Sequence, residues 1–327
     1  MPHPMPHVLV AGKLHPSGIA LLRARPDLSF DYVEEVSEPS CAALIDRADA
    51  LVIRTQPLSA ATVAKAGRLR IVSRHGVGYD SVDLPALNAR GIALAVVGDV
   101  NSISVAEQAM MLLLAAAKRA IRADRAVRSG GWTWRNGLEP GELWGKRLLI
   151  IGFGRAGRHL ARMARGFGME IRAHDPFLAA RGWPEDQEGG QVAPAGLAEG
   201  LAWADFVSVH APRTDRPVIG APELAAMKPS AILVNTARGG VVDEPALIAA
   251  LTENRLAGAG LDVFDAEPPA PENPLLAMDN VILSPHVAGL TTECAERMAI
   301  GAVQNVIDFL DGNPDTNLIV NKEAVDA

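Results

Sequence analysis

The sequence predicts an α/β protein made of two doubly wound domains. Short β-like segments alternate with helix-like segments over residues 8–97, which is typical of βαβ units and a mainly parallel sheet. Hydrophobic residues make up 49% of the chain and aromatic residues only 4%, so Ala, Val, Leu and Ile must fill the core, as they do in parallel sheets covered by helices. At 327 residues the chain is long enough for two domains.

The first half contains several candidate strands and helices. The strands are expected at residues 8–11, 29–33, 50–53, 70–73 and 92–96. The helices between them are expected at residues 18–24, 41–47, 60–66 and 84–89. No Gly-x-Gly-x-x-Gly pattern follows any of these strands, so we predict a doubly wound domain without a nucleotide-binding turn.

A glycine-rich loop in this half is a candidate anion site. Gly76 and Gly78 follow the strand candidate 70–73 and allow successive backbone N–H groups to point at an anion. Arg54 ends the strand candidate 50–53, at the carboxyl edge of the sheet, where ligands of such folds bind. An ordinary turn before a helix and a solvated surface arginine are the alternative interpretations.

Residues 101–128 are predicted to form one long helix. Ser104 can cap its start, with Glu107 three residues further on, as in a capping box. The middle of this helix, residues 109–117, is apolar on all faces, a pattern that requires burial all round. We therefore expect it to be buried between domains or between subunits, with a homodimer interface near it.

The chain is organised around a strand, a glycine-rich turn and a helix. The apolar run 148–151 enters a Gly-x-Gly-x-x-Gly turn whose glycines are Gly152, Gly154 and Gly157. The first allows a sharp turn, the second lets a pyrophosphate approach the backbone, and the third lets the helix pack close to the strand. The N–H groups near Arg155 and Ala156 would meet the anion at the positive end of the helix dipole. This pattern predicts a Rossmann dinucleotide-binding domain.

The next strand candidate, residues 170–174, ends in an acidic residue. Asp175 follows Gly157 by 18 residues. An acidic side chain at this offset accepts hydrogen bonds from the adenosine ribose and repels a 2′-phosphate, which favours NAD over NADP. The alternative interpretation is a tight turn next to a loop carboxylate.

Later strands bring polar groups to the same sheet edge. They are expected at residues 206–210, 232–235, 259–261 and 281–283. Carboxyl ends of parallel strands meet at the edge where a dinucleotide would lie. The polar residues at or just after these ends include His210, Thr236, Asp262 and His286. A last amphipathic helix, residues 291–310, has no further strands beside it and is expected to return to the first domain.

Three side chains of this half suit acid–base chemistry on a carbonyl. His286 can donate and recover a proton near neutral pH. Glu267 lies in a loop stiffened by two prolines and would stabilise the protonated ring and orient it. Arg238 can hold a carboxylate with two hydrogen bonds and polarise a neighbouring carbonyl. A core histidine, a loop acid and a surface ion pair are the simpler interpretations, but together the three predict a nicotinamide-dependent reduction.

Composition excludes several other functions. The net charge of −7 and the lack of a long Lys/Arg run argue against nucleic-acid binding. The longest apolar run, 109–117, is about half of what a bilayer requires, and the N-terminus does not resemble a signal peptide. Cys41 and Cys294 show no CxxC spacing, so we expect reduced thiols in the cytoplasm. No metal site is predicted, because no ligand spacing relates the early histidines His3, His7 and His15.

Several motifs resemble those of the D-isomer-specific 2-hydroxyacid dehydrogenases. The longest are NTARGGVVDE at residues 235–244, GLDVFDAEP at 260–268 and SPHVAG at 284–289. GVGYD at 76–80 and SVAE at 104–107 also match, so the resemblance covers nearly the whole chain. This family includes phosphoglycerate dehydrogenase and the glyoxylate/hydroxypyruvate reductases.

The resemblance implies a Rossmann NAD-binding domain, residues 103–288, inserted into a flavodoxin-like substrate-binding domain, residues 1–102 and 289–327. A cleft between the domains and a homodimer formed through the long helix are also implied. NADH would give a hydride to the C2 carbonyl of a small 2-keto acid, and the product would be a D-2-hydroxy acid.

The resemblance also implies roles for residues. Arg238 and the backbone N–H groups of Val77 and Gly78 would hold the substrate. We add Arg54 as a further cation that binds the substrate. His286, kept protonated by Glu267, would supply the proton and would recover it in the reverse reaction. Asp262 would contact the nicotinamide carboxamide. Besides the glycine turn and Asp175, the implied cofactor-binding residues are His210, Ala211, Pro212, Thr214, Thr236, Ala237, Arg238, Asp262, His286 and Ala288.

Two other functions remain open. Oxidation of D-3-phosphoglycerate would need cations for a phosphate near Arg54, Arg74 or His75. His75 stands where phosphoglycerate dehydrogenases often carry a small residue, and the chain ends soon after the last helix, so feedback through a C-terminal regulatory domain is not expected. An NAD-sensing, corepressor-like binding protein is the alternative from another class, because such relatives can keep the set formed by Arg238, Glu267 and His286.

Overall fold

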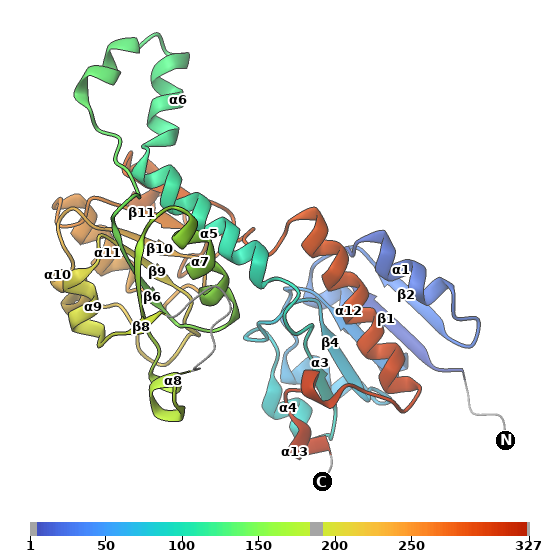
Figure 1. Cartoon of the computed structure of the whole chain (residues 1–327). Helices are drawn as coiled ribbons and strands as arrows, with labels where there is room; N and C mark the ends of the chain where they lie inside the picture. The colour runs from blue at the N-terminus through green and yellow to red at the C-terminus, as the bar shows by residue number, and fades with distance from the viewer. Residues whose placement is uncertain (1–4, 184–191, 326–327) are drawn as a thin grey trace. The chain divides into compact units, whose positions relative to one another are not determined.

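The computed structural model describes residues 5–183 and 192–325. The chain forms two compact units, Met1–Asn101 with Leu290–Ala327, and Ser102–Gly289 (Figure 1). His3, one of the early histidines, lies outside the described residues. Among the described residues, no helix is long and apolar enough to cross a membrane.

The first unit contains a five-stranded parallel sheet with strand order β2-β1-β3-β4-β5. This is the doubly wound order seen in flavodoxin-like folds. Its strands are β1 (His7–Ala11), β2 (Ser29–Val33), β3 (Ala50–Ile53), β4 (Ile71–Arg74) and β5 (Ala93–Ala95). Each lies within one residue, at either end, of the range that the sequence predicts.

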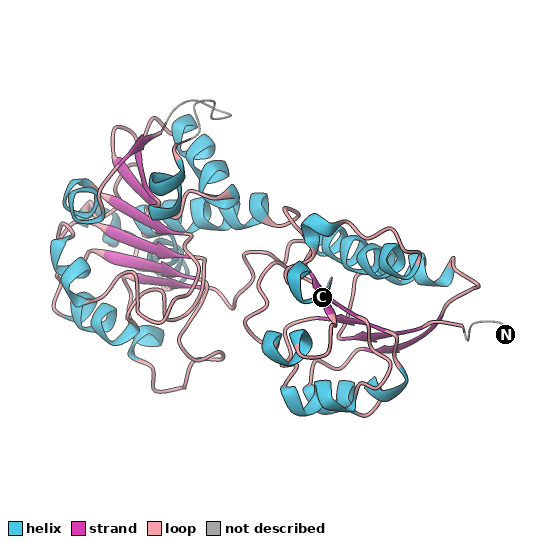
Figure 2. Cartoon of the chain, turned by 90° about the horizontal axis from the view of Figure 1, so that it is seen from below, coloured by secondary structure: helices cyan, strands magenta, loops and turns pink. Residues whose placement is uncertain are grey.

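Helices cover both faces of this sheet (Figure 2). One face packs against α1 (Pro16–Arg23) and α12 (Thr292–Leu310), which approach so closely that a Cβ on Gly18 would lie 2.8 Å from the carbonyl oxygen of Ala299. The other face packs against α2 (Glu38–Ala42), α3 (Ala60–Lys65) and α4 (Leu84–Asn88). The unit ends with η4 (Thr316–Leu318) and α13 (Lys322–Val325). The helix expected at 41–47 is instead α2 followed by the 3₁₀ turn η1 (Ile45–Arg47).

The second unit contains a seven-stranded parallel sheet with the order β12-β11-β10-β9-β6-β7-β8. Its strands are β6 (Arg147–Ile151), β7 (Glu170–His174), β8 (Ala193–Pro194), β9 (Phe206–Val209), β10 (Ile232–Asn235), β11 (Gly258–Leu261) and β12 (Val281–Leu283). The chain runs outward from β6 through β7 to β8 and then returns to β9 on the other side of β6. The boundary between β6 and β9 is therefore the switch point, where ligands of such sheets bind.

Helices cover both faces of this sheet as well. One face packs against α5 (Ser102–Ala117) and α7 (Arg155–Gly166), the other against α9 (Leu197–Trp203), α10 (Ala221–Ala226) and α11 (Glu244–Thr252). Shorter elements are α8 (Pro176–Arg181) and η3 (Pro274–Ala277). Within this unit, α6 (Ala120–Arg128) and η2 (Trp132–Gly137) project away from the sheet (Figure 1). The predicted α/β class with doubly wound parallel sheets is confirmed.

The prediction of one long helix at 101–128 is wrong. Arg119 adopts a left-handed conformation with φ of 52°, which separates α5 from α6. Its guanidinium donates to the carbonyl oxygen of Ala257, 3.2 Å away. No Gly or Pro marks this break, so the local sequence contains no stop signal.

A further expectation for this helix is also wrong. Helix α5 begins at Ser102, so Ser104 is a buried residue within its first turn rather than a cap paired with Glu107. Within a single chain, Met111 of the apolar stretch 109–117 stays 43% exposed, so burial of this side against a second subunit stays a prediction.

Candidate active site

The glycine turn between β6 and α7 lies at the switch point and presents backbone without side chains at its three glycines. Gly152 has a φ of 89°, and a Cβ there would lie 2.7 Å from the backbone of Ala211. A Cβ on Gly157 would lie 2.4 Å from the carbonyl oxygen of Gly152. Gly154, the N-cap of α7, has open space where a Cβ would be and no side-chain cap. The helix start near Arg155 therefore suits a bound anion.

Asp175 has a structural role that its position in the sequence did not indicate. Its Oδ2 accepts a hydrogen bond from the N–H of Phe153, 2.8 Å away, in the glycine turn. Its Oδ1 caps α8 by accepting from the N–H groups of Phe177 and Leu178, at 3.0 and 3.1 Å. One carboxylate thus ties the end of β7 to the turn that follows β6.

The segment after β9 lies across the switch point from the glycine turn. His210 Nε2 contacts Ser208 Oγ at 2.9 Å, and its buried Nδ1 has no partner among the described residues. Burial lowers the pKa of His210 to about 4, so its ring is neutral at pH 7. Ala211 is half-buried, and Pro212 and Thr214 are exposed.

The segment after β10 carries a second unpartnered group. Thr236 is 5% exposed, and its Oγ1 has no partner in the described chain. Asn235 anchors the loop, because its side chain accepts from the N–H of Ala237 and donates to the carbonyl oxygen of Arg238, both at 3.0 Å. The half-buried Arg238 donates from Nη1 to the carbonyl oxygen of Ala237 at 2.7 Å.

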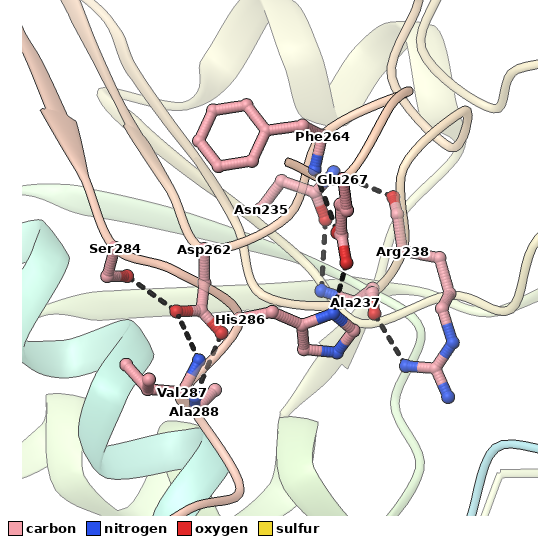
Figure 3. Close-up of polar contacts among 10 residues, drawn as sticks. All are labelled: Asn235, Ala237, Arg238, Asp262, Phe264, Glu267, Ser284, His286, Val287 and Ala288. Carbon is pink, nitrogen blue, oxygen red and sulfur yellow. Dashed lines mark hydrogen bonds and ion pairs between the residues drawn. The ribbon is translucent and has the colours of Figure 1, made fainter. Parts of the chain in front are cut away.

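An ion pair joins the loops after β11 and β12 (Figure 3). His286 Nδ1 lies 2.7 Å from Glu267 Oε2, and the two side chains are 45% and 36% exposed. The other oxygen of Glu267 accepts from the N–H of Phe264 at 3.1 Å, which fixes the carboxylate. Because Nδ1 contacts the carboxylate, Nε2 is the ring nitrogen left to exchange a proton with a ligand.

The loop that carries Arg238 packs closely against the loop that carries Glu267. A Cβ on Gly239 would lie only 1.9 Å from the carbonyl oxygen of Phe264, so the loop carrying Arg238 touches the loop carrying Glu267. Figure 3 shows Arg238, Glu267 and His286 in one cluster. The structure thus brings together the three residues selected for acid–base chemistry.

Asp262 has a structural role besides the one that the resemblance implies. It is fully buried, and its carboxylate accepts from the Ser284 hydroxyl and from the N–H groups of Val287 and Ala288, at 2.5, 3.0 and 2.9 Å. A carboxylate has about four acceptor positions, so one remains for another donor. Through these bonds Asp262 holds the turn that carries His286.

The remaining predicted residues belong to the first unit. Arg54 follows β3 and donates from Nη1 to the carbonyl oxygen of Lys13 at 2.9 Å. His75 follows β4 and is 6% exposed, and burial, together with the charges of Arg54 and Arg74, lowers its pKa to about 4. Val77 and Gly78 follow Gly76, whose φ is 149°.

Comparison with known proteins identifies the family. The model of the D-isomer specific 2-hydroxyacid dehydrogenase NAD-binding domain matches residues 110–288. A glyoxylate reductase from Korarchaeum cryptofilum is 40% identical over 98% of this chain and 97% of its own. The chain belongs to the D-isomer specific 2-hydroxyacid dehydrogenases. A D-3-phosphoglycerate dehydrogenase from Archaeoglobus fulgidus is 36% identical to this chain. The match covers 95% of this chain and 59% of that relative.

Solved structures agree with this assignment. An NADPH-dependent glyoxylate/hydroxypyruvate reductase from Sinorhizobium meliloti matches with a TM-score of 0.84 and 31% identity, over 98% of both chains. A D-lactate dehydrogenase from Aquifex aeolicus, complexed with NAD and lactic acid, matches with a TM-score of 0.86 and 27% identity, over 96% of this chain and 98% of the other. The family predicted from the motifs is confirmed, and the protein is a D-2-hydroxyacid dehydrogenase with an NAD(P)-binding domain.

The residues of this dehydrogenase fit a dinucleotide. The open cradle at Gly154 and the unpartnered buried atoms of His210 and Thr236 offer room and polar groups along one sheet edge. Sequence reasoning missed the supporting residues of this edge, Asn235, Gly239, Ser284 and Gln108. Polar residues at or just after strand ends, such as Asn235 and Ser284, were the available signal. Nothing local marks Gln108, which lies on α5.

Proposed function

We propose that this enzyme reduces a small 2-keto acid, such as glyoxylate or hydroxypyruvate, to the D-2-hydroxy acid with NADH. The main support is the 2.7 Å contact between His286 and Glu267 beside Arg238, at the carboxyl edge of a dinucleotide-binding sheet. Relatives named glyoxylate reductase add further support.

Each residue of the site then has one task. Arg238 binds the substrate carboxylate and polarises the C2 carbonyl, and we assign Arg54 and the N–H groups of Val77 and Gly78 to the same substrate. A bound reduced nicotinamide supplies the hydride to C2. His286 gives its Nε2 proton to the developing alkoxide, while Glu267 holds Nδ1–H and compensates the charge of the protonated ring.

The first experiment follows NADH absorbance with glyoxylate, hydroxypyruvate, pyruvate, phenylpyruvate and phosphohydroxypyruvate. We expect rapid turnover of one of the smaller acids. In His286→Ala, kcat should fall by about 10²–10⁴-fold, because general acid catalysis contributes that much, while NADH binding, followed by fluorescence, stays close to that of the wild type. Unchanged turnover in this variant would show that another group supplies the proton.

Phosphoglycerate dehydrogenase activity is the alternative. Arg54 follows β3 and Arg74 ends the neighbouring strand β4, so two cations stand at the same edge of the first sheet, as a phosphate would require. Preferential turnover of phosphohydroxypyruvate would favour this reading. NADH binding without turnover of any acid would instead point first to an unusual substrate and then to a cofactor-sensing role.

We propose NAD rather than NADP as the cofactor because of Asp175. Asp175→Asn keeps an oxygen to cap α8, loses the acceptor for the N–H of Phe153, and removes the charge that would repel a 2′-phosphate. The preference for NADH over NADPH, measured as the ratio of kcat/KM values, should narrow by about tenfold, as expected for about 1.4 kcal/mol of electrostatic energy. An unchanged ratio in a stably folded variant would remove Asp175 from the ribose site.

We also propose a cytoplasmic homodimer. Cys41 and Cys294 are buried thiols, which suits a reducing compartment. The exposed apolar side of α5, described below, is the proposed interface.

A further inference from the structure

The turn that carries His286 is unfavourable by itself. The φ of His286 is 52°, in the left-handed region that residues with a Cβ rarely occupy. Such a conformation persists only where surrounding contacts hold it. Here the N–H of His286 donates to the carbonyl oxygen of Asp262 at 2.8 Å.

One buried carboxylate holds the two residues that follow. The Asp262 side chain accepts from the N–H groups of Val287 and Ala288. Asp262 is 0% exposed and forms no ion pair with a Lys, Arg or His in the described part of the chain. Its charge therefore depends on neutral donors, and losing one of them leaves a buried carboxylate poorly solvated.

The third donor, the Ser284 hydroxyl, has only one proton. Ser284 Oγ lies 2.5 Å from Asp262 Oδ1 and also 2.9 Å from Gln108 Nε2, on α5. Because an amide N–H can only donate, Gln108 must donate to Oγ, and the single hydroxyl proton is then directed to Asp262. A chain of hydrogen bonds thus runs from α5 to the turn at His286.

We propose that Gln108 is a positioning residue for His286, acting through Ser284 and Asp262. This inference rests on the proposed function, in which His286 moves the proton. Gln108 contacts neither reacting atoms nor His286. It orients the Ser284 hydroxyl toward Asp262, the carboxylate that holds the left-handed turn, and so affects the place of the imidazole relative to Glu267.

The test replaces the donor at residue 108 with an acceptor, which removes the hydrogen bond that Gln108 donates to Ser284. In Gln108→Glu a carboxylate competes with Asp262 for the Ser284 proton, and kcat should fall about tenfold, the effect of one hydrogen bond to a charged group. The KM of the keto acid should stay within about twofold, because Arg238 is not part of this chain of bonds. Gln108→His retains a ring N–H donor and should recover most of the activity. Gln304→Glu is the control, since Gln304 also donates a side-chain hydrogen bond, to Asp308 at 2.6 Å, but on α12 and outside this chain of bonds.

Two further readouts separate positioning from general damage. If Gln108 acts through Ser284, the double variant Gln108→Met/Ser284→Ala should lose no more than about twofold beyond Ser284→Ala alone. Multiplicative losses would overturn the inference.

Hydrogen exchange at the Val287 and Ala288 amides should be faster in Gln108→Glu than in Gln304→Glu, a result that does not depend on turnover. Absence of turnover in the wild type would count against the proposed function. Unchanged amide exchange would count against the role of Gln108, and so would an unchanged kcat in an active enzyme.

Discussion

Two histidines of this protein face opposite electrostatic surroundings. His286 is 45% exposed and contacts the carboxylate of Glu267. His75 is 6% exposed, and burial and the cations Arg54 and Arg74 disfavour its charged form. Both follow strands, and the sequence indicates His286 for proton transfer and His75 only near a possible phosphate. Of these two histidines, His286 is the one whose ring contacts a carboxylate, which is why we assign proton transfer to it.

His75 should make the protein sensitive to mild acid. Its pKa falls from 6.5 to about 4 on folding, so between these values the unfolded chain binds a proton that the native protein does not. The free energy of unfolding therefore decreases as the pH falls through this window. From pH 7 to pH 5 the loss is about 2 kcal/mol for this histidine.

Urea denaturation of the wild type and His75→Gln at both pH values would check this prediction. The wild type should lose about 2 kcal/mol more than the variant. The comparison is needed because His210, whose pKa is also lowered to about 4, contributes a similar loss to both proteins. Equal losses in the two proteins would contradict the prediction.

At the scale of elements, two glycines of the turn after β6 have different roles: Gly157 allows close packing, and Gly154 leaves space for the cofactor. Gly157→Ala would place a Cβ 2.4 Å from the carbonyl oxygen of Gly152, so we expect the free energy of unfolding to fall by about 1–3 kcal/mol. Gly154→Ala meets no atom of the described residues within 4 Å and should change the free energy of unfolding by no more than about 0.5 kcal/mol. Its Cβ would occupy the proposed pyrophosphate space, so the Kd for NADH should rise at least about tenfold.

Urea denaturation and fluorescence titration of both variants would measure these two effects separately. Normal NADH binding by Gly154→Ala would place the pyrophosphate elsewhere.

Elements were predictable where short-range patterns specify them. Apolar runs and turns located β6, β7 and β10 to within one residue, because strand and turn formation depends on neighbouring residues. The break between α5 and α6 was not predictable. Arg119 is stabilised there by contact with Ala257, a residue far along the chain, and helix-forming residues lie on both sides.

At the scale of the whole molecule, α5 leaves an apolar surface exposed. We define the α5 hollow by its lining residues, Glu107, Met110, Met111, Leu114, Ala115, Lys118, Ala120, Met163 and Phe167. Within it, Met111 is 43% and Phe167 40% exposed. Contiguous apolar surface of this kind marks protein–protein contacts, which supports a second copy as its occupant.

Met111→Lys should weaken the proposed dimer at least about tenfold, because a charged side chain would be buried in an apolar contact. Sedimentation equilibrium of the wild type and the variant measures this. Leu276→Lys is the control, since Leu276 is 45% exposed but lies outside the α5 hollow. A wild type that is monomeric at micromolar concentration would refute the dimer.

By itself, the sequence determined the α/β class, the glycine turn and the family, because each is encoded in residues close together along the chain. It also selected Arg238, Glu267 and His286, whose motifs are local. Only the tertiary structure decided that Glu267 meets Nδ1 of His286, that Asp262 holds the turn of His286, and that Gln108 reaches Ser284. These contacts join residues from different strands and helices, and a contact of that kind exists only once packing brings the elements together.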